Sequence, residues 1–385
     1  MNQLDQLNQY RATRIFSYSD ARTMARRRLP RLVFDYMEGA AGDELAMARN
    51  RKALDAVLLS PRSLVDVDQR TLKTSFLKQD WDLPFGIAPM GMCNLAGPGT
   101  DQHFASAATH HNIPLGHSTA ASSNIEDMAA QAGDKLWFQL YVGQSIELGL
   151  QLVQRAKDSG CQTLILTVDV PEVAQRLRDK RNGFKAPLKI GPKQFLDFAF
   201  HPQWSLTTLA AGVPELANFK NDDGSTQQFN REDGRGKLTW EFLKQLREIW
   251  KGNLVIKGIM HTDDARQAAD HGVDAIYVSN HGGRQLDSAP ASITRLRQIR
   301  RALGSDMPLI IDSGIRSGDD IVRAYASGAS FVMVGRPFLF AAAAAGKAGV
   351  TRFTDVLAQQ TSSVMAQTGV TEIGEISEKM LVQAD

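Results

Sequence analysis

Eight short apolar runs constrain the fold of this chain more than any other feature of its sequence. They occupy residues 85–88, 114–117, 137–141, 163–168, 254–256, 275–278, 309–311 and 331–334. Near-continuous apolar runs of this length are typical of strands that are buried on both faces of a parallel sheet. Helical patterns separate most of them, for example at 145–159 and 319–326. Eight strand–helix units predict an α/β fold of the (β/α)8 TIM-barrel type.

The rest of the chain divides around this barrel. Residues 1–75 are expected to form N-terminal helices that pack on the barrel, and residues 76–385 to form the barrel itself. A long insertion at 184–238 follows the fourth predicted strand. It combines aromatic side chains with lysines, which suits a lid, a membrane-contacting patch or plain packing: Phe195, Phe198, Phe200, Trp204, Lys185, Lys189 and Lys193.

Charge and cysteine content narrow the classes of partner and compartment. The chain has 44 Lys and Arg against 42 Asp and Glu, a net charge of +2, so we expect no nucleic-acid partner. Its two cysteines, Cys93 and Cys161, show no metal-ligand spacing, and no metal site is predicted. So few cysteines favour a reducing, cytoplasmic location. The polar N-terminus lacks the apolar core of a signal peptide, and peripheral contact with the inner face of a membrane stays open.

Polar or small residues follow every predicted strand. In such a barrel the carboxyl ends of all eight strands meet at one mouth, where chemistry is placed. The residues expected there are Ala88, Ser118, Gln139, Tyr141, Thr167, Asp169, Lys257, Ser279, His281, Asp312, Gly314, Arg316, Gly335 and Arg336.

The sixth strand end combines a titratable base with a fixed cation. His281 and Arg284 lie three residues apart around two glycines that allow close backbone approach to a ligand. A base that takes a proton and a guanidinium that binds a carboxylate suit the activation of a hydroxy acid. Asp169 could orient the imidazole. Arg176 and Tyr36 could help to hold the carboxylate. Alone, the run could also be an ordinary strand-to-helix loop.

The last two strand ends resemble a phosphate cradle. Residues 312–318 contain two glycines and Arg316, and Gly335 with Arg336 open the final turn. Barrels commonly bind phosphate with the loops after strands seven and eight. Lys257, at the end of an apolar strand, predicts an anionic partner such as a reduced flavin ring. The alternative is a lysine that is simply exposed at the rim.

Four motifs together resemble a known family. They are Ser-Asn-His-Gly-Gly-Arg-Gln-Leu-Asp at 279–287, Trp-Phe-Gln-Leu-Tyr at 137–141, Thr-Val-Asp at 167–169 and Asp-Ser-Gly-Ile-Arg at 312–316. Over nearly its whole length the chain resembles the FMN-dependent α-hydroxy acid dehydrogenases and oxidases. It looks most similar to the membrane-associated respiratory L-lactate dehydrogenases, through segments 201–204 and 373–383 and through Ala120.

The resemblance implies a role for each residue at the mouth. His281 would be the base, backed by Asp169. Tyr36, Arg176 and Arg284 would bind the carboxylate, and Tyr141 the substrate hydroxyl. Lys257 would face N1 and O2 of FMN. The remaining residues would contact the flavin ring or ribityl chain (Ala88, Ser118, Gln139, Thr167, Ser279) or the ribityl end and phosphate (Asp312, Gly314, Arg316, Gly335, Arg336).

The implied reaction is FMN-dependent oxidation of L-lactate to pyruvate by a homotetramer. Electrons would pass to a quinone or a cytochrome-type acceptor. An oxygen-using oxidase with a glycolate- or mandelate-type substrate is an alternative, and so is a non-catalytic barrel that binds a phosphorylated ligand. Leu177 and Met90 depart from the residues common in the family and leave the shape of the substrate pocket open.

Overall fold

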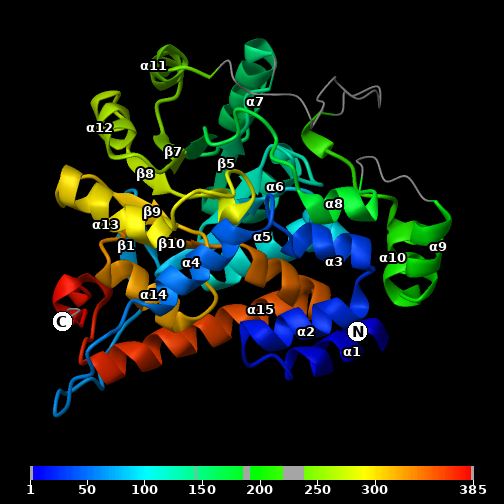
Figure 1. Cartoon of the computed structure of the whole chain (residues 1–385), viewed down its shortest axis with the longest axis horizontal. Helices are drawn as coiled ribbons and strands as arrows, with labels where there is room; N and C mark the ends of the chain where they lie inside the picture. Colours follow the sequence, from blue (N-terminus) through cyan, green and yellow to red (C-terminus); the bar gives the residue numbers. More distant parts are fainter. Residues whose placement is uncertain (1–2, 144, 185–190, 220–237, 383–385) are drawn as a thin grey trace.

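A closed barrel of eight parallel strands forms the centre of the computed structural model, which describes residues 3–143, 145–184, 191–219 and 238–382 (Figure 1). The strand order around the barrel is β10-β3-β4-β5-β6-β7-β8-β9. The strands are β3 (Phe85–Met90), β4 (Leu115–Ser118), β5 (Leu136–Leu140), β6 (Thr163–Thr167), β7 (Asn253–Ile259), β8 (Ala275–Val278), β9 (Leu309–Ile311) and β10 (Phe331–Val334). All eight predicted strands and the (β/α)8 barrel are confirmed: three strands have the predicted bounds, and the ends of the other five differ by at most three residues.

Apolar side chains fill the barrel, and a hairpin closes the end opposite its mouth. The hairpin pairs β1 (Thr74–Phe76) with antiparallel β2 (Gln79–Trp81). The Phe76 ring stacks on that of Phe331 at 5.0 Å, and the Trp81 ring meets that of Trp137 edge-on at 6.1 Å. These large rings bury apolar area at the base of the barrel, which leaves only the opposite end for a ligand.

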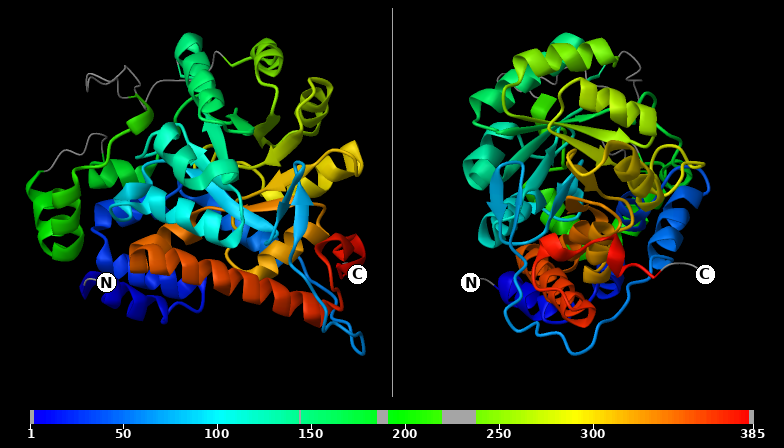
Figure 2. Two further views of the ribbon diagram at one scale, coloured as in Figure 1. Left: turned by 180° about the vertical axis from the view of Figure 1, so that it is seen from behind. Right: turned by 90° about the vertical axis from the view of Figure 1, so that its left-hand side faces the viewer.

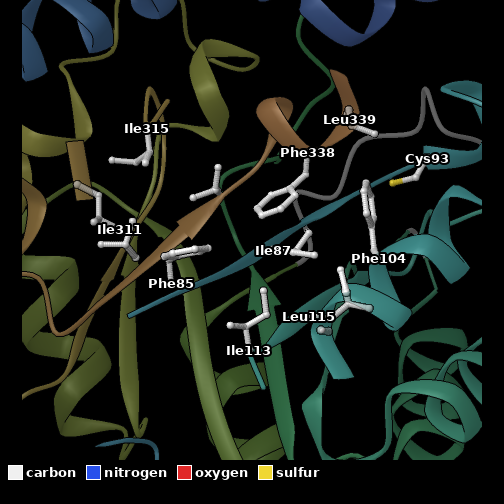
Figure 3. Close-up of a cluster of buried hydrophobic side chains, with 14 of the residues drawn as sticks. Phe85, Ile87, Cys93, Phe104, Ile113, Leu115, Ile311, Ile315, Phe338 and Leu339 are labelled. Atoms are coloured by element: carbon white, nitrogen blue, oxygen red, sulfur yellow. The ribbon is translucent and has the colours of Figure 1, made fainter. Parts of the chain in front are cut away.

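Helices cover the outside of the barrel. They are α5 (Thr100–His111), α6 (Ile125–Ala132), α7 (Ile146–Asp158), α11 (Trp240–Ile249), α12 (Thr262–Asp270), α13 (Ser292–Leu303), α14 (Gly318–Ala326) and α15 (Arg336–Thr368). Ile87 of β3 lies among the side chains of Phe104 on α5 and Phe338 on α15 (Figure 3). The two phenylalanine rings are 6.4 Å apart. Helix α15 is interrupted at Gly346, whose φ of 56° lies in the left-handed region.

The N-terminal segment wraps the barrel and reaches its mouth. Its helices are α1 (Gln3–Ala12), α2 (Tyr18–Arg28), α3 (Arg31–Glu38) and α4 (Leu45–Asp55), and residues 56–73 contain no helix. Helices α1 and α2 lie along α15 (Figure 2). Helix α4 reaches the sixth strand end, where Asn50 and Asn280 exchange two side-chain hydrogen bonds of 2.8 Å. The N-terminal helices are therefore part of the mouth as well as its support.

Helix α8 (Leu177–Asn182) precedes the insertion, and the described part of the insertion forms helices α9 (Pro192–Ala199) and α10 (Pro202–Ala211) and the short helix η3 (Ala217–Phe219). Residues 185–190, with Lys185 and Lys189, and 220–237 lie outside the described residues. Helices α9 and α10 form a pair at the edge of the molecule (Figures 1 and 2). Trp204 is buried and donates from Nε1 to the carbonyl of Leu95 at 2.8 Å, which fixes α10 to the barrel.

Four single-turn helices complete the fold: η1 (Cys93–Leu95), η2 (Gly133–Lys135), η5 (Ile373–Glu375) and η6 (Glu378–Met380). After these four and η3, a sixth single-turn helix of the described residues, η4 (His281–Gly283), belongs to the mouth. In the part of the chain that the structure describes, no helix is both long enough and apolar enough to cross a membrane.

Candidate active site

One cavity of about 560 Å³ opens at the carboxyl ends of the strands. It brings together most of the predicted site residues: Tyr36, Ala88, Ser118, Tyr141, Arg176, Lys257, His281, Arg284, Asp312, Gly314, Arg316, Gly335 and Arg336. The other four, Gln139, Thr167, Asp169 and Ser279, adjoin it. A larger space of about 1230 Å³ lies between α1, α10 and α15 and contains none of these residues. The convergence of polar groups therefore identifies the smaller cavity as the candidate active site.

His281 lies between a carboxylate and a phenol. Its Nδ1 is 3.0 Å from Oδ1 of Asp169, and its Nε2 is 3.1 Å from the Tyr141 hydroxyl. A proton on Nδ1 directed at Asp169 leaves the Nε2 lone pair to face the cavity wall formed by Tyr141. The backbone of His281 has a φ of 59°, and its N–H donates to Oγ of Ser279 at 3.0 Å. This left-handed turn, unusual for a residue with a side chain, places the ring over the barrel mouth.

Gly283, the second glycine after His281, lets α4 approach. Gly283 has a φ of 78°, and a Cβ atom there would be 2.6 Å from the backbone nitrogen of Met47. Its carbonyl accepts a hydrogen bond from the N–H of Ala41 at 2.9 Å. Any larger residue at 283 would push α4 away from the mouth. At Gly283 the predicted close backbone approach is thus to the N-terminal segment, at Ala41 and Met47.

Charge and burial set the protonation of this pair. Burial lowers the pKa of His281, and the Asp169 carboxylate offsets only part of that change. For Asp169 burial acts in the opposite direction, but the nearby His281 and Lys257 leave its pKa below the ordinary value. At neutral pH the imidazole is therefore neutral and the carboxylate ionised. That combination is what a general base and its orienting partner require.

Two arginines and a tyrosine line the same side of the cavity. Arg284 donates from Nη1 to the carbonyls of Tyr36 at 2.9 Å and Gly39 at 2.6 Å, and its guanidinium lies 5.3 Å from the Tyr36 ring centre. The Tyr36 ring stacks on that of Phe184 at 4.3 Å. Arg176 is the residue immediately before α8. These contacts hold Arg284 and Tyr36, two of the three predicted carboxylate-binding residues, in fixed positions.

A cluster of ion pairs that sequence reasoning missed holds α8 against α3. Arg178 donates to Glu38 at 2.8 Å and also pairs with Glu44. Glu38 is buried and has a second partner in Arg22. The partners are far apart in the chain, so no local pattern indicates them. Because Arg178 lies two residues after Arg176, this cluster fixes the loop that carries Arg176.

Lys257 is buried in a polar network at the floor of the cavity. Its Nζ donates to Oγ of Ser279 at 3.1 Å and lies 3.7 Å from Oδ2 of Asp312. Burial alone would lower the pKa of Lys257, but Asp312 and Asp169 more than compensate and raise it. The ammonium group is therefore charged. Lys257 lies within β7 rather than at its end, and the strand continues for two residues after it.

Two buried polar atoms beside the network suit a bound heterocycle. Nε2 of Gln139 and Oγ1 of Thr167 have no hydrogen-bond partner among the described residues. The Oε1 atom of Gln139 accepts from Ser118 at 2.8 Å, which fixes the amide. Unpaired buried groups of this kind cost about 1–3 kcal/mol each unless a ligand or water satisfies them. Together with the Lys257 ammonium, they fit the polar edge of a flavin ring.

The last two strand ends form the opposite side of the cavity. Gly314 has a φ of 99°, and the Arg316 guanidinium lies 4.7 Å from the Tyr18 ring centre. Arg336 donates to the carbonyls of Met37 at 3.2 Å, Gly282 at 2.9 Å and Gly39 at 2.9 Å. Burial lowers the pKa of Arg336 to about 10, so it stays charged at neutral pH. Two cations and a glycine-rich turn fit a phosphate group.

Comparisons with known proteins agree with this chemistry. The model of the FMN-dependent dehydrogenase family matches residues 25–383. An L-lactate dehydrogenase of Xanthobacter autotrophicus (strain ATCC BAA-1158 / Py2) is 38% identical over 376 residues, covering 96% of this chain and 97% of that protein. An (S)-mandelate dehydrogenase of Pseudomonas putida is 38% identical over 367 residues, covering 94% and 93%.

The fold agrees equally well with solved structures. A structure of (S)-mandelate dehydrogenase described as a monotopic membrane protein superposes with a TM-score of 0.92 at 37% identity, covering 96% of this chain and 100% of that one. Lactate and mandelate are both 2-hydroxy acids. The chain therefore belongs to the FMN-dependent dehydrogenase family and is an enzyme that oxidises 2-hydroxy acids with FMN as its cofactor.

Proposed function

We propose that the protein oxidises L-lactate to pyruvate and that His281 is the base. The observation that carries this proposal is the hydrogen-bonded chain from Asp169 through His281 to Tyr141, next to Arg176 and Arg284 in one cavity. A neutral imidazole with its Nε2 toward the cavity can take a proton from the substrate. The two arginines provide planar, charged donors for the substrate carboxylate.

Each residue has a separate part in the proposed reaction. Arg284, Arg176 and the Tyr36 hydroxyl bind the carboxylate, so that the reacting carbon is held in one orientation. His281 takes the proton at Nε2, and Asp169 stabilises the imidazolium that forms. Tyr141 donates to the oxygen of the substrate hydroxyl group.

The cofactor would be held by the remaining predicted residues. Lys257 and Gln139 would contact its ring, together with Ala88, Ser118, Thr167 and Ser279. Asp312, Gly314, Arg316, Gly335 and Arg336 would hold its ribityl and phosphate end. When bound, FMN accepts the two electrons that leave the substrate carbon.

L-Lactate is favoured by the apolar wall of the cavity. Met90 and Met92 line it with long side chains, and Val170 and Val173 line it from the loop before Arg176. Such a wall suits a short apolar substituent on the reacting carbon, which in L-lactate is a methyl group. (S)-Mandelate is the second candidate, because its dehydrogenase is as similar to this chain as the lactate enzyme is.

Anaerobic turnover with an artificial electron acceptor separates the two substrates. We expect kcat/KM for L-lactate to exceed that for (S)-mandelate by at least about tenfold. The reverse order would assign the mandelate reaction. Release of hydrogen peroxide as fast as lactate is consumed in air would instead assign an oxidase. A preparation without the flavin absorption band, or one whose band neither acid bleaches, would refute the proposed reaction.

We further propose that a membrane quinone accepts the electrons and that the chain binds the membrane peripherally through α9 and α10. This pair exposes large apolar side chains, with Phe200 81% and Leu209 77% exposed. Phe195, Leu196 and Leu206 extend the apolar surface. Exposed apolar groups of this size are typical of membrane or protein contacts. The solved relative described as monotopic supports a membrane.

Co-sedimentation with anionic phospholipid vesicles tests the membrane contact. Replacing Phe200 and Leu209 by Ser should release the protein into the supernatant. The matched control is Leu64→Ser, which removes a fully exposed leucine from another surface and should leave binding unchanged. Equal release by both variants would refute the assignment to α9 and α10. The proposed homotetramer is tested by sedimentation velocity of the same preparations.

A further inference from the structure

A buried tyrosine lies beside Lys257 in the interior of the barrel. Tyr277 of β8 is fully buried, in an apolar cluster that includes Phe331, Met333 and Val255. Its Cα is paired in register with that of Lys257 on β7. A hydroxyl group in such surroundings costs free energy unless it is hydrogen-bonded. Its partner therefore indicates what the hydroxyl does.

That partner is the carboxylate that also neutralises Lys257. The Tyr277 hydroxyl donates to Oδ2 of Asp312 at 3.0 Å, and the Lys257 Nζ lies 3.7 Å from the same oxygen. The other oxygen, Oδ1, accepts from Ser279 at 2.6 Å and from Ser313 at 2.7 Å. Burial, reinforced by Asp312, raises the pKa of Tyr277 well above its ordinary value, so the phenol remains a donor.

Tyr277 thus donates a hydrogen bond to the same carboxylate oxygen that Lys257 faces as an ion-pair partner. With the phenol in place, the ammonium group stays at 3.7 Å from Asp312 and donates to Ser279. The Lys257 Nζ also lies 5.1 Å from the centre of the Tyr277 ring, which stabilises the cation. Removing the hydroxyl would leave Oδ2 short of a donor in a site of low dielectric. Lys257 would then move toward Asp312, and more of its charge would be neutralised.

We propose that Tyr277 is a positioning residue, which keeps the charge of Lys257 available to the flavin by occupying Oδ2 of Asp312. The proposal rests on the proposed placement of Lys257 beside the flavin ring. A cation there favours the reduced, more negative ring over the oxidised one. Tyr277 does not line the cavity, so its effect should appear in the flavin potential.

Tyr277→Phe tests this because it removes one oxygen atom and keeps the ring. We expect the ratio of reduced to oxidised bound FMN at a fixed potential to fall about tenfold, which is about 30 mV for a two-electron couple. If FMN binds weakly, the ratio of its dissociation constants in the two redox states gives the same quantity. The matched control is Tyr325→Phe, which removes another buried hydroxyl, bonded to the carbonyl of Pro84 at 2.9 Å. It should reduce stability without changing the potential.

Lys257→Met, alone and combined with Tyr277→Phe, separates this inference from the proposed function. If Lys257→Met leaves the ratio unchanged, the placement of Lys257 is wrong and the inference fails with it. If Lys257→Met lowers the ratio of reduced to oxidised FMN, but Tyr277→Phe gives the same ratio as the wild type and the Tyr325→Phe control, only the inference is overturned. An equal effect of Tyr277→Phe with and without Lys257 would also overturn it. The inference expects Tyr277→Phe to have no further effect once Lys257 is absent.

Discussion

Asp169→Asn is the variant that most directly tests the proposed base. The carboxylate lies 3.0 Å from Nδ1 of His281, and the side chains of both residues are largely buried. Asn has nearly the same shape but no charge, so the fold and the FMN site should be retained. The imidazolium that forms when His281 takes the proton would then lack its counter-charge. The amide can also favour the wrong imidazole tautomer.

The size of the loss follows from this distance. Two unit charges 3.0 Å apart attract by about 5.5 kcal/mol at an effective dielectric constant of about 20. If half of the proton charge has moved to His281 in the transition state, about 2.8 kcal/mol is lost. These two values correspond to rate reductions of about 10⁴-fold and about 100-fold. We therefore expect the rate of flavin reduction to fall by a factor in this range.

Anaerobic single-turnover reduction of the bound flavin by L-lactate measures this step directly. The matched control is Asp355→Asn, which removes the carboxylate of another Asp–His pair, with His111 at 2.9 Å, on the surface. That variant should reduce flavin at the wild-type rate. An Asp169→Asn enzyme that binds FMN and reacts within about threefold of the wild type would refute the role of the pair, since a charge at this distance cannot count for so little.

The pH dependence and the ion-pair cluster give two further predictions. Burial lowers the pKa of His281, so the acid limb of the pH profile of kcat/KM should lie below the ordinary histidine value of about 6.5. Activity should be lost as the pH falls through this limb, because the base becomes protonated. An acid limb above about 6.5 would contradict a buried base. Arg178→Ala should raise KM about tenfold, with a smaller change in kcat, because Arg176 loses its support. Arg301→Ala, which breaks an exposed pair with Glu378, should change neither, and equal effects would disprove the positioning role.

The barrel could be predicted from the sequence because its signal is local and repeated. Each strand is an apolar run of a few residues, and β/α alternation fixes the order in which the strands pair. The ends of the strands depend on contacts between neighbouring strands and have no such local signal. Lys257 was expected at a strand end, but β7 continues to Ile259 because Gly258 adopts a φ of 104° and allows the chain to pass Asp169. A residue pattern does not reveal a register shift of that kind.

The site divides in the same way between local and long-range features. His281 and Arg284 are recognisable because their spacing lies within one loop, and the barrel topology then brings Asp169 to the same mouth. Arg178 and Glu38 have no such signal: they are 140 residues apart and meet only because α3 folds over α8.

The partner of Tyr277 inside the barrel also could not be predicted from a local sequence pattern. In sequence Tyr277 is one more large residue of an apolar strand, and nothing local distinguishes it from a packing residue. Only closure of the barrel places its hydroxyl against Asp312. The sequence therefore predicts which groups reach the mouth, because strand ends converge whatever the side chains are. It does not predict which partner each group meets there, and in a buried network the partner decides how much charge Lys257 retains for the flavin.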